Sequence, residues 1–148
     1  MRVYHSRQPF TDPSGDRLRN WLGLDEPAFY DRARVAIVPM AFCFPGYDGK
    51  GSDLPPPPIC AKTWHHRVMA ALPDVKLRIL IGAAAHRYHL GTTTRVTDTV
   101  MARRNHGPHS FALPHPSWRN TGWIKNNPWF EAEVLPALRA RVKEVLND

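Results

Sequence analysis

Two short runs rich in β-branched residues show almost no alternation of polar and apolar side chains. Residues 34–39 read Arg-Val-Ala-Ile-Val-Pro, and residues 77–82 read Leu-Arg-Ile-Leu-Ile-Gly. Such runs are typical of strands that are covered on both faces in a parallel sheet. Residues 110–114 predict a third, shorter strand. These runs constrain the fold most, because parallel strands need a long crossover, usually a helix, between them.

Segments with helical periodicity alternate with these runs. Residues 12–23 combine an N-cap aspartate, a first-turn proline, leucines four residues apart and a closing glycine. The last segment begins with Asn127 as N-cap and Pro128 in the first turn, and a proline inside it, Pro136, predicts a kink. Further helices are expected near residues 64–72, 83–90 and 97–104.

Alternating strands and helices predict an α/β fold. We expect a three-layer sandwich with a short, mostly parallel sheet flanked by helices, formed by residues 1–148 as a single domain. In such folds ligands bind at the carboxyl ends of the strands. Residues 44–58, rich in Gly, Pro, Asp and Ser, predict a long loop, and loops of that length are usually functional.

The charge balance favours an anionic partner. Twenty Lys and Arg oppose thirteen Asp and Glu, for a formal net charge of +7, and the isoelectric point is near 9.9, as expected for a protein that binds nucleic acid. The N-terminus has no apolar signal region, and the longest apolar run, residues 35–44, is too short to span a bilayer. We therefore expect a cytoplasmic protein with no membrane partner.

A histidine follows the third predicted strand directly, in Leu113-Pro114-His115-Pro116-Ser117. Together with Trp118-Arg119-Asn120 and Lys125, this segment resembles the second catalytic motif and intercalating loop of uracil-DNA glycosylases, closest to the branch that carries an iron–sulfur cluster. Residues 7–10 (Arg-Gln-Pro-Phe) are similar to that branch's Gly-Arg-Pro-Phe segment. Residues 38–46 are similar to its strand-to-loop segment ending in a cluster cysteine. The resemblance covers nearly the whole chain.

The resemblance implies base flipping and cleavage of the N-glycosidic bond. His115 would donate a hydrogen bond to the uracil oxygen on which negative charge grows, and Phe10 would stack on the flipped base. Pro39, Met40 and Ser117 would line the substrate site. The residues expected to lie against DNA, which is the implied partner, are Trp118, Arg119, Asn120 and Lys125.

Two cysteines, Cys43 and Cys60, frame the long loop. The resemblance makes them two of the four thiolates that hold a [4Fe–4S] cluster in the full-length form of such proteins. An alternative is a zinc site in which His65 or His66 joins the two cysteines, and a further alternative is a pair of ordinary thiols.

The chain departs from the family's pattern in three places. The first motif, with its N-terminal strand, is missing, so we expect a truncated domain whose exposed sheet edge favours self-association. Pro39 stands where related enzymes carry an asparagine that reads the uracil edge. Residues 83–85 are alanines and offer no polar group to the pocket.

Three functions remain open. The first is a DNA-repair glycosylase whose activity is weak or absent in this chain. The second is a non-catalytic descendant or fragment that binds nucleic acid. The third is a small α/β protein with a structural metal site at Cys43, Cys60 and His65.

Overall fold

The protein, in a computed structural model that describes residues 6–147, divides into two compact units. The central unit is Val38–Leu113, and the terminal unit combines Met1–Ile37 with Pro114–Asp148. None of the helices within residues 6–147 has the length and apolar character needed to cross a membrane. The two ends of the chain thus contribute to one body, and the middle of the chain forms the other.

A parallel pair of strands forms the sheet of the central unit. Strand β1 (Arg78–Ile81) pairs with β2 (Ser110–Leu113) along their whole length. Leu80, Ala112 and Leu113 are buried in this sheet. Both strands were predicted from their apolar runs, and the parallel α/β class is confirmed.

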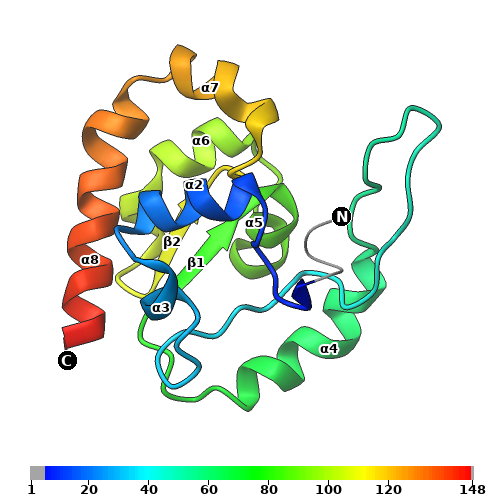
Figure 1. The fold of residues 1–148 in the computed structure, drawn as a ribbon, viewed down its shortest axis with the longest axis horizontal. Helices are drawn as coiled ribbons and strands as arrows, with labels where there is room; N and C mark the ends of the chain where they lie inside the picture. The colour runs from blue at the N-terminus through cyan, green and yellow to red at the C-terminus, as the bar shows by residue number, and fades with distance from the viewer. Residues whose placement is uncertain (1–5, 148) are drawn as a thin grey trace. The chain divides into compact units, whose positions relative to one another are not determined.

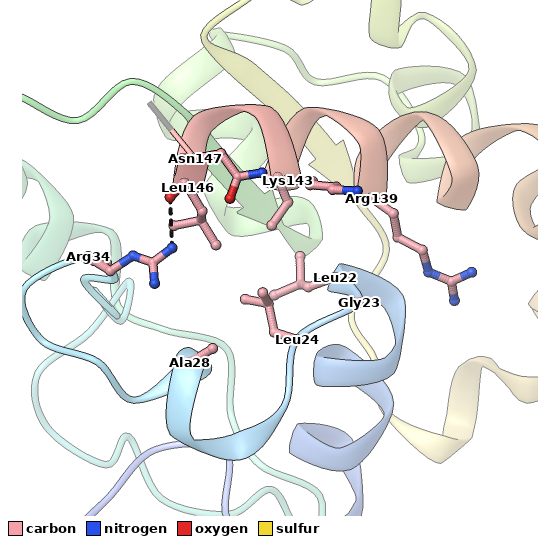
Figure 2. Close-up of a pocket in the computed structure, with 10 residues that line it drawn as sticks. Leu22, Gly23, Leu24, Ala28, Arg34, Arg139, Lys143, Leu146 and Asn147 are labelled. Carbon is pink, nitrogen blue, oxygen red and sulfur yellow. Dashed lines mark hydrogen bonds between the residues drawn. The ribbon is translucent and has the colours of Figure 1, made fainter.

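Two helices form the crossover that the parallel strands require. Helix α5 (Gly82–Leu90) packs on both strands, and α6 (Val96–Met101) packs on β2, as Figure 1 shows. A 3-10 turn, η1 (Arg103–His106), then leads into β2. The helix predicted at residues 97–104 therefore ends earlier and tightens into this turn. The β1–α5–α6–β2 order is the unit that the alternating sequence pattern predicted.

Helix α4 (Pro58–Ala70) precedes β1, and its first residue is the last proline of the four-proline run. Proline suits the first helical turn because its missing N–H has no partner there in any helix. The predicted second helix is confirmed and starts about a turn and a half earlier than its apolar spacing indicated. The predicted loop before it is also confirmed, with one antiparallel bridge between Tyr47 and Asp53.

The prediction of a strand at residues 34–39 is wrong. The segment is irregular, and none of its six residues is buried. Within residues 6–147 the parallel sheet consists of β1 and β2, so this segment has no ladder partner there. Its backbone groups bond locally, since the Val35 N–H donates to Asp31 O at 2.8 Å. The boundary between the two units also falls inside it, at Ile37.

Helix α2 (Pro13–Leu22) forms as its sequence predicted. The Asp12 carboxylate accepts from the Gly15 N–H at 3.1 Å, and the chain leaves the helix through Gly23 in the left-handed conformation. The helix buries Leu18, Trp21 and Leu22. Its apolar face packs on the C-terminal helix, α8 (Leu135–Asn147), and forms the core of the terminal unit (Figure 1).

The C-terminal segment is not one continuous α-helix. A π-helical turn, η3 (Phe130–Val134), comes directly before α8. Pro136 has no N–H for the carbonyl of Ala132, and its ring would clash with that carbonyl in a regular helix. Widening the preceding turn removes the conflict. The sequence predicted a kink at Pro136, and the structure has a π-helical turn directly before α8.

A short helix between α2 and the predicted strand was not anticipated. Helix α3 (Glu26–Phe29) is capped by the Asp25 carboxylate, which accepts from Ala28 N at 2.8 Å. It buries Phe29 against the ring of Tyr30, with ring centroids 5.0 Å apart. One turn of helix is too short to leave a periodic signal in the sequence.

Acid should destabilise the central unit through two histidines of α5. Burial lowers the pKa of His89 to about 4, with the charges of His65 and Arg78 adding to the effect, and burial also lowers the pKa of His86. An unfolded histidine titrates near pH 6.5, so below that pH the unfolded chain binds more protons. The free energy of unfolding, measured with urea, should fall as the pH is lowered from 7 to 5. His89→Gln should flatten this dependence; an equal slope in both proteins would contradict the assignment.

Candidate functional site

His115 is presented to solvent between two buried prolines. Pro114 and Pro116 are fully buried, whereas His115 is exposed. Two prolines fix the backbone on either side of the imidazole and restrict its movement. The ring therefore stands two residues beyond the carboxyl end of β2, at the position that the sequence indicated.

The neighbouring backbone sets the tautomer of the neutral His115 ring. The Ser117 N–H donates to Nδ1 of His115 at 3.2 Å. A nitrogen that accepts a hydrogen bond carries no proton, so the neutral ring holds its proton on Nε2. In its neutral form the imidazole is therefore a hydrogen-bond donor at Nε2.

The residues after His115 form a compact turn held by its own polar groups. Asn120 Nδ2 donates to His115 O at 2.7 Å, and the Ser117 hydroxyl accepts from Arg119 N at 3.3 Å. A 3-10 turn, η2 (Trp118–Asn120), and helix α7 (Thr121–Asn126) follow. The segment that resembles an intercalating loop is thus largely helical, and hydrogen bonds of the Ser117 and Asn120 side chains hold its first turn.

Arg17 of helix α2 holds this turn in place through two hydrogen bonds. No pattern in the sequence indicated this role. Its Nη1 donates to Ser117 O at 2.9 Å and its Nη2 to the Thr121 hydroxyl at 3.1 Å. A guanidinium suits this task, because its donors form a planar fork that can reach two acceptors at once. Since the contact joins residues one hundred positions apart, no local pattern could reveal it.

Phe10 contacts the same helix and has a strained backbone conformation. Its φ is +61°, a left-handed value that is uncommon for a bulky residue. Its carbonyl accepts from Arg19 Nη1 at 3.1 Å and lies against Gly15, where an added Cβ would overlap the Phe10 oxygen. Strain of this kind clusters at functional sites. Helix α2 therefore contacts Phe10 through Gly15 and the His115 turn through Arg17.

Three side chains of the turn reach solvent. Trp118 is 72% exposed, and Arg119 and Lys125 are exposed as well. The Arg119 guanidinium lies 5.9 Å from the centre of the Trp118 ring. An exposed indole next to cations matches the chemistry of a nucleic-acid contact, in which rings stack on bases and cations meet phosphates.

Pro39 and Met40 belong to the central unit. Pro39 is exposed, Met40 is half-buried, and Pro39 O accepts from Nε2 of the buried His65 at 2.8 Å.

His86, the first residue after the three alanines, is buried, and its Nε2 donates to Leu80 O at 3.0 Å. His86 is thus a polar group at the end of the β1 strand that the sequence reasoning overlooked.

A sequence model described as the uracil DNA glycosylase superfamily matches residues 2–139. The chain belongs to this superfamily. Membership makes DNA the partner and base excision by hydrolysis the general chemistry of the family. It also accords with the parallel α/β sheet and with a histidine placed just beyond a strand end.

The two cysteines of this uracil-DNA glycosylase superfamily member lie together in the central unit. Partial burial raises the pKa of the Cys60 thiol, and a hydrogen bond with Cys43 raises it further. Within residues 6–147 no group of three His, Cys, Asp or Glu side chains could hold a metal, so the zinc site with His65 or His66 finds no support. A [4Fe–4S] cluster takes four thiolates, and the chain carries two. These residues alone do not fit the cluster.

Gly15→Ala should disrupt the site through the backbone. The new methyl group would overlap the Phe10 carbonyl, so the segment before α2 must move. We expect a loss of roughly 2–4 kcal/mol in the free energy of unfolding, measured with urea. Gly122→Ala is the matched control, because Gly122 is helical and its Cβ position is open. That change should be neutral or stabilising; equal effects of the two variants would contradict the close contact.

Arg17→Ala should loosen the His115 turn. Removing a charged donor leaves Ser117 O and the Thr121 hydroxyl without this partner, and such bonds are worth roughly 1.5–3 kcal/mol. Amide hydrogen exchange over residues 117–121 should accelerate by about tenfold or more. Arg32→Ala, which removes an exposed arginine of the same unit, should leave these rates unchanged. Unchanged exchange in Arg17→Ala would show that the turn holds without the brace.

Proposed function

We propose that this chain is a uracil-DNA glycosylase-like repair domain in which His115 stabilises the departing base. The observation that carries the proposal is the bond from Ser117 N to Nδ1 of His115, which leaves the neutral ring with its proton on Nε2. Breaking an N-glycosidic bond leaves negative charge on the base oxygens, and a fixed neutral donor stabilises that charge. A neutral imidazole is suited to this role because it arrives as a donor and holds its own proton.

The outer face of the turn would assist base flipping. Base flipping costs a few kcal/mol, and a side chain that enters the stack offsets part of this cost. Trp118 is exposed enough to enter a base stack, with Arg119 and Lys125 available for phosphates. Phe10 would stack on the extruded base, with its carbonyl held by Arg19.

Base discrimination would be weak in this domain. Pro39 has neither a side-chain donor nor an N–H with which to read the uracil edge. Met40 would give this part of the site an apolar surface without a hydrogen-bonding group. We therefore propose slow turnover with relaxed base preference. We also propose kinship with the cluster-bearing branch, on the likeness of the segments around Cys43 and His115, although two cysteines do not by themselves supply the four thiolates of a cluster.

A base-release assay with His115→Ala tests the proposal. Release of uracil from single- and double-stranded oligonucleotides should be slow in the wild type and fall a further 10²–10³-fold in the variant, which is the effect of losing one fixed donor. His66→Ala is the control, since His66 is exposed on α4. It should match the wild type.

Two results would overturn the catalytic proposal. One is fast, uracil-selective turnover that His115→Ala leaves unchanged. The other is complete absence of base release from a protein that still binds the oligonucleotide, which would establish a non-catalytic nucleic-acid-binding domain. The exposed Trp118, Arg119 and Lys125 would serve that second function equally well.

A further inference from the structure

The long loop before α4 is an ordered hairpin. Asp48 N donates to Ser52 O at 2.7 Å and Leu54 N donates to Gly46 O at 2.9 Å, on either side of the Tyr47–Asp53 bridge. At its tip the Asp48 carboxylate accepts from the N–H groups of Lys50 and Ser52, both at 2.8 Å. Backbone and carboxylate bonds therefore build the turn, and its aromatic side chains are not needed to fold it.

Large apolar side chains are displayed on this hairpin and on the start of α4. Phe44 is 61% and Tyr47 is 50% exposed, and their rings meet edge to face with centroids 4.9 Å apart. Exposed apolar groups collected in one segment mark an interaction surface. The aromatic hairpin, as we name this surface, comprises Phe42, Phe44, Tyr47, Leu54, Ile59 and Trp64, all exposed.

Cations lie on the same hairpin and helix as these rings. Lys50 lies at the tip, and Lys62 and Arg67 lie on α4. The Arg67 guanidinium sits 5.2 Å from the centre of the Trp64 ring. Within residues 6–147 none of the three takes part in an ion pair, so their charges are available to a ligand.

We propose that the aromatic hairpin binds single-stranded DNA without regard to sequence. Every base has a flat apolar face that can stack on an exposed ring, and the phosphates between bases pair with cations. A duplex hides its base faces, so the surface should favour single strands. Aromatic residues and arginine are also common in protein interfaces, but lysine is depleted there, so Lys50 and Lys62 favour a nucleic acid as the ligand. The proposal goes beyond base excision, because the hairpin excludes His115 and needs no uracil.

Fluorescence anisotropy with labelled oligodeoxyadenylate, which contains no uracil, tests the proposal. The double variant Phe44→Ala/Tyr47→Ala should bind about tenfold or more weakly, as expected when stacking surfaces are lost. Lys50→Ala/Lys62→Ala should reduce the slope of log affinity against log salt by about 1.4. Met101→Ala removes an apolar side chain that is 57% exposed on α6, and it should bind as the wild type does.

Further measurements separate this surface from the excision site and from a misfolded variant. His115→Ala should bind oligodeoxyadenylate normally, so loss of base release and loss of strand binding can be told apart. Trp64→Ala, a single change on α4, should also weaken binding, with an unchanged circular dichroism spectrum. Unchanged affinity in both aromatic variants would overturn the proposal. So would loss of a dimer in sedimentation with DNA affinity intact, which would make the hairpin a self-association surface.

Discussion

Helix α2 is the element on which the terminal unit depends. Its buried face carries Trp21, whose ring meets Phe130 at a centroid distance of 5.0 Å, and its polar face carries Arg17, which bonds to Ser117. In the same helix, Gly15 leaves room for the Phe10 carbonyl, which occupies the space that a side chain at this position would need. A single helix thus connects the apolar core with both segments of the proposed base-binding site, and a shift of α2 would displace them together.

The chemistry proposed for His115 relies on small constraints. Buried prolines fix its backbone, one N–H fixes its tautomer, and the Asn120 amide closes the turn over its carbonyl. None of these groups is itself reactive. Together they hold one donor in place, and preorganisation is what makes a single hydrogen bond valuable in catalysis.

The sequence predicted what depends on near neighbours. The Asp12 cap of α2, the strands on either side of α5 and the position of His115 all follow from local rules, and the structure has them. The strand at residues 34–39 failed because β propensity does not supply a pairing partner. Arg17 and Gly15 were missed since their roles arise from contacts that only the folded chain creates.

The division of the chain also orders events during synthesis. Helix α2 leaves the ribosome more than one hundred residues before its partner Phe130, a delay on the order of ten seconds. The central unit, made from one continuous stretch, can fold within that interval. Until α8 arrives, the apolar face with Trp21 remains without its cover, so the nascent protein passes through a state that chaperones would recognise.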